Sequence, residues 1–266
     1  MLFRSDAAAY LAQGYRVVAF EADPGLAAAG RKRFADAIAA GRLTIVEGAI
    51  GPGDGPVLRF YRHPGHTHFG TIDAGWAERN RALGWESEAV DVARVDFAAE
   101  LARHGTPKYL KIDIEGADRL VLEALLESEA RPAFVSIESS KTSFAALRAE
   151  FDLLGRLGYD RFKLAQQEGI GATELTVTSA AGTPMRLRHE DGGSGQWGDD
   201  LPGRWLGAAS ALLAYRAVFL RYRLFGDFGI LARLVGGKRL SWVSWRLGVV
   251  LAGWHDTHAR HRSAVN

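Results

Sequence analysis

Short apolar runs alternate with longer segments of helical periodicity along the first two thirds of the chain. The clearest example begins at Tyr109, where apolar residues continue to Ile114 and then recur at helical spacing from Ala117 to Ser128. Strands that alternate in this way with helices of about ten residues or more predict a parallel sheet covered by helices. We therefore expect an α/β fold with a mostly parallel sheet and helices on both of its faces.

The same pattern predicts most of the other elements. We expect strands at 15–20, 43–46, 57–61, 90–95, 109–114, 133–137 and 161–165, and helices at 7–13, 25–40, 97–104, 117–128 and 143–157. A stretch rich in Gly, Asp and Ser at 192–203 predicts a linker or loop. It divides a first domain, 1–191, from a C-terminal extension, 204–266, that looks mostly helical and rich in Trp and Arg.

Composition narrows the class of protein. The 266 residues carry a net charge of +2 and include no Cys, which excludes a disulfide scaffold and any thiolate metal site. No apolar segment typical of a secretory signal follows Met1. Arg216 and Arg246 interrupt the two most apolar stretches, so we expect no membrane-spanning helix and a cytoplasmic protein.

The positive charge is concentrated in the C-terminal extension. From residue 201 onward, ten Lys and Arg residues face only two acids, Asp227 and Asp256. Basic helices with aromatic residues can contact nucleic acid or lie on an anionic membrane surface. Gly and Ser interrupt the apolar faces and no dense basic cluster occurs. We therefore favour a helical cap that packs its Trp residues internally, keep peripheral membrane contact as the alternative, and expect no nucleic-acid partner.

Histidines recur in two places without a metal-binding pattern. His63, His66 and His68 lie among Pro and Gly, lack the i, i+4 spacing of a helical zinc motif, and predict a solvated loop. His255, His258 and His261 recur every third residue, which together with the neighbouring arginines predicts a basic terminal helix. We assign no metal ligand to either group.

Acidic residues end three of the expected strands: Glu21, the pair Asp113 and Glu115, and Glu138. The carboxyl ends of parallel strands form the edge where open α/β sheets bind their ligands. Asp113 and Glu115 lie two apart on an extended segment and would point to the same side. Together with Glu138 they could orient an alcohol and accept its proton, or bind a divalent cation such as Mg²⁺.

Each of these acids also has a simpler interpretation. Glu115 could cap the helix expected to begin at Ala117, and the sequence favours this role and a catalytic role equally. Asp113 could bind backbone amides, although its place beside other acidic strand ends favours the site, as does that of Glu138. Asp96 is most simply the N-cap of the helix at 97–104.

Glu21 has the position of an acid that binds a ribose. In nucleotide-binding sheets, such an acid ends the second strand, about 20 residues beyond a glycine-rich loop that follows the first strand. Counting back from Glu21 reaches Met1 without a strand or a glycine-rich loop, so we expect an N-terminally incomplete domain. A nicotinamide-dependent oxidoreductase would require a Gly-x-Gly-x-x-Gly turn after a strand, and this sequence has none.

Several segments are similar to the FkbM-type methyltransferases. The segments that carry this resemblance are 15–24, 43–50, 111–118, 135–138 and 158–159, with weaker matches at 195–200, 203–205 and 254–259. The most specific is Lys-Ile-Asp-Ile-Glu-Gly at 111–116. The resemblance covers roughly residues 7–165 and lacks the family's first strand and glycine-rich motif.

This resemblance implies a Rossmann-like class I fold that transfers a methyl group from S-adenosylmethionine, usually to a hydroxyl oxygen. The residues that it implies for cofactor binding are Glu21 at the ribose, Ala22 and Asp23 beside it, and Ala49 and Ile50 at the adenine. Asp113 would lie near the methionine end. The implied acceptor is a hydroxyl on a small molecule or glycan, and the alternative is a catalytically impaired remnant or a membrane-surface binding module.

Overall fold

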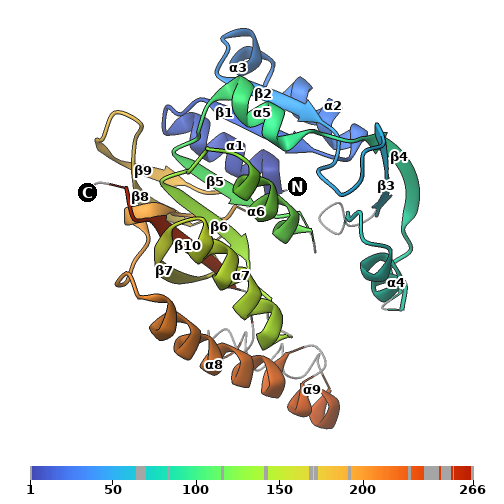
Figure 1. Ribbon diagram of the computed structural model, residues 1–266, viewed down its shortest axis with the longest axis vertical. Coiled ribbons are helices and arrows are strands. Elements are labelled where there is room, and N and C mark those ends of the chain that lie inside the picture. The colour runs from blue at the N-terminus through green and yellow to red at the C-terminus, as the bar shows by residue number, and fades with distance from the viewer. Residues whose placement is uncertain are drawn as a thin grey trace. The chain divides into compact units, whose positions relative to one another are not determined.

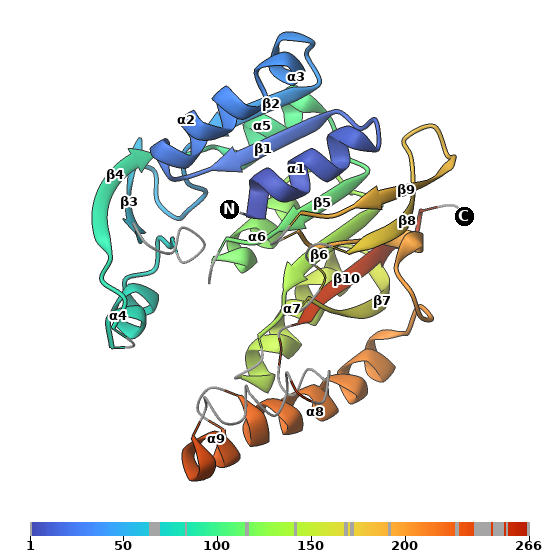
Figure 2. The ribbon, with the colours of Figure 1, turned by 180° about the vertical axis from the view of Figure 1, so that it is seen from behind.

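The computed structural model describes residues 2–63, 70–82, 84–114, 117–140, 143–167, 170, 173–190, 193–226, 229–236, 246, 253 and 255–264. Figures 1 and 2 show its elements. The strands are β1 (Val17–Glu21), β2 (Leu43–Glu47), β3 (Val57–Arg62), β4 (Glu88–Ala93), β5 (Tyr109–Ile112), β6 (Phe134–Glu138), β7 (Tyr159–Gln166), β8 (Glu174–Thr178), β9 (Pro184–Arg188) and β10 (His255–His261). The helices are α1 (Leu2–Ala12), α2 (Pro24–Arg33), α3 (Ala35–Ala39), α4 (Ala74–Ala82), α5 (Phe97–His104), α6 (Asp118–Glu127), α7 (Phe144–Arg156), η1 (Gly198–Asp200), α8 (Ala208–Phe225) and α9 (Ile230–Val235).

The chain forms two compact units. Unit 1 comprises Met1–Pro107, Ile112–Ala130 and Ile170–Gln196, and unit 2 comprises Lys108–Lys111, Arg131–Gly169 and Trp197–Asn266. Each unit contains segments that lie far apart in the sequence. The boundaries expected at 191 and 204 from composition stay predictions.

Unit 1 contains the parallel pair β1–β2, in register from Val17 opposite Leu43 to Glu21 opposite Glu47. Apolar side chains from α1, β1, α3 and β2 form a core between these elements; its buried members are Leu11, Ala19, Ala37 and Leu43. The antiparallel pairs β3–β4 and β8–β9 belong to the same unit. This packing fixes the carboxyl ends of β1 and β2 next to each other.

Unit 2 contains a sheet with the strand order β5-β6-β10-β7. β10 is antiparallel to both β6 and β7, which therefore run parallel to each other. Phe162 of β7 is fully buried and packs on Phe151 of α7, with 4.6 Å between ring centroids. Tyr215 of α8 packs edge-on against Phe151, so the same core extends from the sheet through α7 to α8.

The prediction of a terminal helix around His255, His258 and His261 is wrong. These residues belong to β10, which hydrogen-bonds to a neighbouring strand on each of its edges. Their spacing of three resembled a helix face, but two partner strands far away in the sequence determine the conformation instead. The C-terminal segment therefore contributes a central strand to the sheet of unit 2.

The α/β class is confirmed, but the described sheets are small and mix parallel with antiparallel pairs. The expected single, mostly parallel sheet is therefore not what the described strands form. β10 accounts for part of this difference, and the antiparallel pairs β3–β4 and β8–β9 account for the rest. The helix expected at 25–40 is two helices, because Phe34 has a non-helical backbone between α2 and α3 (φ −107°, ψ 25°). None of the helices described is both long and apolar enough to cross a membrane.

Candidate functional site

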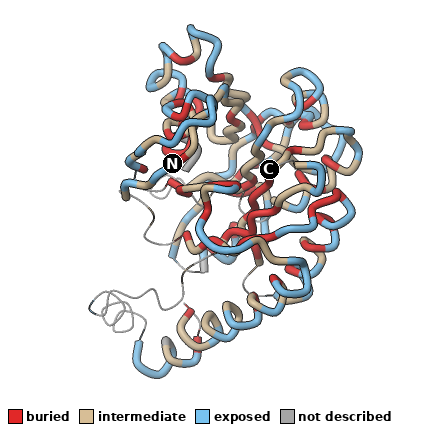
Figure 3. The backbone as a smooth tube through the Cα atoms, turned by 90° about the vertical axis from the view of Figure 1, so that its left-hand side faces the viewer, coloured by how far each residue is buried: buried red, intermediate tan, exposed pale blue. Residues whose placement is uncertain are grey.

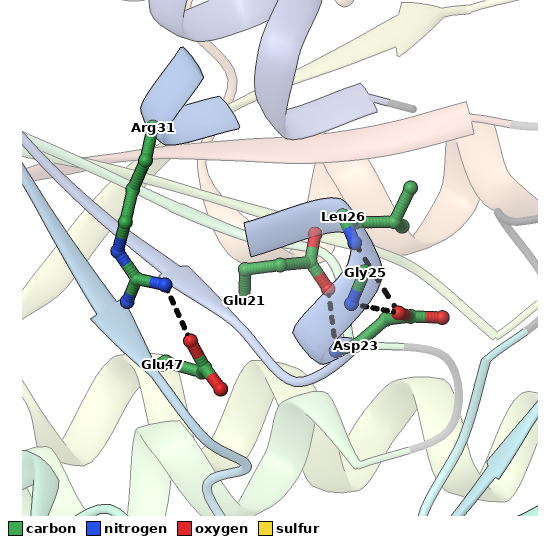
Figure 4. A network of polar contacts seen from close by, with 6 residues as sticks. All are labelled: Glu21, Asp23, Gly25, Leu26, Arg31 and Glu47. Atoms are coloured by element: carbon green, nitrogen blue, oxygen red, sulfur yellow. Dashed lines mark hydrogen bonds and ion pairs between the residues drawn. The ribbon is translucent and has the colours of Figure 1, made fainter. Parts of the chain in front are cut away.

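Glu21 is the last residue of β1, and its half-buried carboxylate is held by the backbone that follows it. The Asp23 N–H donates a 2.9 Å hydrogen bond to Oε1 of Glu21, and Oε2 points away from that amide (Figure 4). Burial raises the pKa of the Glu21 carboxyl, and the hydrogen bond from Asp23 opposes this rise. The hydrogen bond to Oε1 thus fixes the orientation of the carboxylate, and Oε2 is directed away from the Asp23 amide.

Asp23 uses its own carboxylate to start α2. Its Oδ1 accepts hydrogen bonds from the N–H groups of Gly25 (2.7 Å) and Leu26 (3.2 Å), and Pro24 occupies the first helical turn. This is a helix N-cap, in which an Asp side chain satisfies amides that have no partner within the helix. The predicted place of Asp23 beside a cofactor stays a prediction, and its described contacts are those of a cap.

Glu47 ends β2 directly opposite Glu21 in the parallel register. Unlike Glu21, it forms an ion pair with Arg31 of α2, with 2.5 Å between Nη1 and Oε2 (Figure 4). Two carboxylates at neighbouring strand ends therefore have different surroundings. Arg31 neutralises Glu47, whereas among the described residues Glu21 is hydrogen-bonded to a neutral amide, so Glu21 is the better candidate to bind a ligand.

Gly48 connects the ends of β1 and β2 and was missed as a positioning residue by sequence reasoning. Its N–H donates to the carbonyl oxygen of Glu21 over 2.9 Å, and its φ is 141°. A Cβ at this position would lie 2.5 Å from the carbonyl oxygen of Ala93. The available signal was a glycine directly after a strand, but only the fold brings Ala93 next to it.

Ala49 and Ile50 continue from this turn. The N–H of Ala49 donates to Ala93 and its carbonyl accepts from the N–H of Val95, both over 2.9 Å. The polar backbone groups of Ala49 are thus used within the protein, and its side chain is buried. Ile50 is half-buried, so of these two residues it is the one that can border a ligand.

An apolar cluster brings together two of the residues predicted to bind the cofactor. Ala49 packs there with Phe60 and Val92, and Ala22 contacts the same cluster from the other strand end. The Glu21 carboxylate is thus followed in the sequence by Ala22, a half-buried apolar residue that packs on this buried cluster. Such a pairing of one oriented polar group with apolar side chains suits the ribose and the flat ring of a nucleoside.

The acidic motif after β5 is described only in part. Asp113 directly follows β5, is half-buried and belongs to unit 1, whereas Glu115 lies outside the described residues. The helix begins at Asp118, and Ala117 before it makes no side-chain cap. The Asp118 carboxylate accepts a 3.2 Å hydrogen bond from the N–H of Ile114, so this acid closes the turn. The choice between base and cap for Glu115 stays open.

Glu138 ends β6 in unit 2, opposite Asp256 of β10. A buried hydroxyl network follows it: Thr257 is hydrogen-bonded to Ser139 and, over 2.6 Å, to the hydroxyl of Tyr215. Sequence reasoning missed this network because it assigned Thr257 to a helix. Glu21 and Asp113 belong to unit 1 and Glu138 to unit 2, so the joint action of Asp113 and Glu138 stays a prediction.

Two further predictions concern polar groups outside this region. Asp96 is confirmed as the N-cap of α5, since its Oδ1 accepts a 3.0 Å hydrogen bond from the N–H of Ala99. His66 and His68 lie outside the described residues. Within the described part of the chain, no group of three or more His, Asp or Glu side chains could hold a metal ion.

Comparison with protein families gives a match. A family model described as "Methyltransferase FkbM domain" matches residues 3–160, which is more than half of the chain. The matched range contains β1, the Gly48 turn and the acidic motif after β5. No curated protein and no solved structure matches the chain.

Proposed function

Because this chain belongs to the FkbM methyltransferase family, we propose that it transfers a methyl group from S-adenosylmethionine to a hydroxyl oxygen. The observation that carries this proposal is the end of β1. There Glu21 is oriented by the Asp23 amide, while Ala22 contacts the apolar cluster that contains Ala49. These residues fit the ribose and adenine of the cofactor.

In this proposal the Glu21 carboxylate accepts hydrogen bonds from the ribose hydroxyls through Oε2, with Oε1 already bonded to Asp23. Ala22 and Ile50, which are both half-buried, contribute the apolar side chains against which the adenine packs, and Ala49 supports them from the buried cluster. In this proposal Asp23 does not contact the cofactor. Its side chain caps α2, and its N–H holds the Glu21 carboxylate in position. The elevated pKa of Glu21 is consistent with a carboxyl partly removed from water, where a hydrogen bond to ligand is strengthened.

Bound S-adenosylmethionine supplies an activated methyl group on a positively charged sulfur. Glu21 and Ala22 would hold this cofactor, and its methyl group would be available to an acceptor hydroxyl. The protein then needs to align the acceptor and remove its proton. We propose that Asp113, which follows β5 directly, accepts the proton of the acceptor hydroxyl. Glu115 and Glu138 are proposed as further acids that orient the acceptor. A small molecule or glycan hydroxyl is the proposed acceptor, and the cytoplasm the proposed compartment.

Glu21→Gln tests the cofactor site. Glutamine keeps the shape of the side chain but removes its negative charge and one acceptor function. We expect the dissociation constant for S-adenosylmethionine, measured by isothermal titration calorimetry, to rise about tenfold to a hundredfold, as for loss of a charged hydrogen bond. Glu47→Gln is the matched control because it changes the opposite strand end, where Arg31 occupies the carboxylate.

The control variant should bind the cofactor within about twofold of the wild type, since no ligand contact is lost. Equal weakening by both substitutions would show a general effect on β1 and β2 and would contradict the assignment of Glu21. If the wild-type chain releases no heat with S-adenosylmethionine, and no binding is detected by equilibrium dialysis, the proposed activity of this chain is wrong. A remnant without catalysis would then be the better description.

Asp113→Asn tests the proton acceptor. The wild-type protein is first assayed for S-adenosylhomocysteine release with a panel of monosaccharides, phenols and hydroxy acids. With the acceptor that responds, we expect Asp113→Asn to lower kcat about a hundredfold, because an amide cannot take the proton. The affinity for S-adenosylmethionine should be retained. Asp96→Asn is the control, since asparagine still caps α5. The role of Asp113 would be contradicted if both variants lost kcat, or if neither did.

A further inference from the structure

α8 has two faces of different character. One face is directed to the core of unit 2: Ala211 and Tyr215 are fully buried, and Phe219 packs edge-on against Phe144 of α7 with 5.4 Å between ring centroids. Figure 1 shows α8 running along unit 2 and leading into α9, and the tube of this helix in Figure 3 alternates between exposed and intermediate colouring. The buried face explains how α8 is attached to its unit.

The opposite face of α8 carries large apolar side chains in contact with water. Leu213 and Leu220 are 67% and 60% exposed. They are seven residues apart and therefore lie on the same side of the helix, two turns from each other. α9 adds Ile230, Leu234 and Val235, of which Leu234 is 74% exposed. Almost all the strongly exposed large apolar side chains described in the chain belong to these two helices.

Arginines accompany these apolar side chains within the two helices. Arg223 lies at a helical position beside Leu220, and Arg233 lies in α9. Arg216 follows Leu213 by three residues at the border of this face, where its guanidinium lies 5.8 Å from the ring centroid of Phe144. All three are exposed. The sequences of α8 and α9 contain no Asp or Glu. We define the α8–α9 face as the apolar residues Leu213, Leu220, Ile230, Leu234 and Val235 together with the basic residues Arg216, Arg223 and Arg233.

We propose that the α8–α9 face binds the surface of an anionic lipid bilayer. An interfacial helix places its apolar side chains at the boundary between headgroups and acyl chains and its basic side chains at the lipid phosphates. The contact with the acyl chains comes from Leu213, Leu220 and Leu234. The contact with the lipid phosphates comes from the arginines. The attraction is complementary, because anionic lipids concentrate negative charge in the plane that meets these side chains.

Charge also distinguishes this partner from two others. A second copy of the chain that met the same face about a twofold axis would place arginines against arginines with no acid on either helix. Nucleic acid would use the arginines but would leave the exposed leucines in water, since its backbone binds charged and polar groups. An anionic bilayer uses both kinds of side chain. The proposal does not depend on the methyltransferase activity.

Sedimentation with lipid vesicles tests the proposal. The full chain is mixed with vesicles of phosphatidylcholine alone and with vesicles that also contain phosphatidylserine, without cofactor. We expect binding to the anionic vesicles and a loss of about tenfold or more in the partition coefficient for the double variant Leu213→Gln/Leu220→Gln. Glutamine keeps helix propensity, so α8 should stay folded. Arg216→Gln and Arg223→Gln should each weaken binding about fivefold and reduce its sensitivity to salt.

Matched controls change exposed residues of the same kinds elsewhere. Val57→Gln removes an exposed apolar side chain of β3, and Arg186→Gln removes an exposed arginine of β9. Both should leave vesicle binding unchanged, and circular dichroism should show the same helix content in all variants. The proposal is overturned if the wild type binds no vesicles, if it binds neutral vesicles equally, or if the leucine variant binds anionic vesicles as tightly as the wild type. A dimer in analytical ultracentrifugation that the leucine variant converts to monomer, without vesicle binding, would identify a second copy as the partner.

Discussion

Replacing Gly48 with alanine should destabilise unit 1 by about 3 to 5 kcal/mol, from backbone strain together with a steric clash. The backbone at Gly48 has φ 141°, which disfavours any side chain. The new Cβ would also lie 2.5 Å from the carbonyl oxygen of Ala93 and 2.8 Å from Cγ2 of Val95. Because the closest of these atoms is backbone, it cannot move aside cheaply. Urea denaturation monitored by fluorescence measures the loss.

The same substitution should weaken binding of S-adenosylmethionine, since the Gly48 N–H holds the Glu21 carbonyl at the end of β1. Two other glycines separate the causes. Gly53→Ala has a positive φ without any heavy atom within 4 Å of the new Cβ, and should cost about 1 to 2 kcal/mol from conformation alone. Gly155→Ala lies inside α7 in open space and should stabilise by about 1 kcal/mol. If Gly48→Ala costs no more than Gly53→Ala, the close approach to Ala93 has no energetic consequence.

His258→Leu should remove a large pH dependence from the stability of unit 2. His258 lies within β10, is 2% exposed, and neither ring nitrogen has a hydrogen-bond partner in the described part of the chain. Burial, followed by the positive charges of Lys111 and Lys163, lowers the pKa of this imidazole to about 3. The folded protein therefore keeps His258 neutral at pH values where the unfolded chain binds a proton.

The sign of the effect follows from proton binding. Above the ordinary histidine pKa of about 6.5, neither state is protonated and His258 makes no pH-dependent contribution. As the pH falls below that value the unfolded state gains a proton and the wild type loses up to about 1.4 kcal/mol of stability per pH unit. Relative to His258→Leu, the loss should reach about 3 kcal/mol at pH 4. Urea denaturation of both proteins from pH 8 to pH 4 measures it; a constant difference across this range would contradict it.

Local patterns predicted the end of β1 well, because its determinants are local. An apolar run ends in Glu21, and the following Asp23-Pro24 supplies a cap and a first helical turn. The place of Glu21 at the end of a strand, on which its proposed role at the ribose rests, could therefore be identified from the sequence. The Gly48 turn could be read as a turn but not as a close approach, because Ala93 reaches it from another strand.

Sequence reasoning failed where distant partners decide the conformation. The three histidines of β10 are three residues apart, which resembles a helix face. Pairing with β6, more than a hundred residues earlier in the sequence, on one edge and with β7 on the other outweighs this local pattern. The β8–β9 hairpin was missed for a different reason, since its strands are short and partly exposed. Both failures removed antiparallel strands from the expected sheet.

The place of β10 has a consequence for the order in which unit 2 folds during synthesis. β6 and β7 leave the ribosome long before β10, which then has to pair with both of them. Until then these two strands lack their shared neighbour, and Tyr215 of α8 lacks Thr257, to which its hydroxyl is bonded. Pairing across such a sequence separation is slow. The nascent chain thus exposes an open edge on each of these two strands until β10 is made, and such edges favour pairing with other chains.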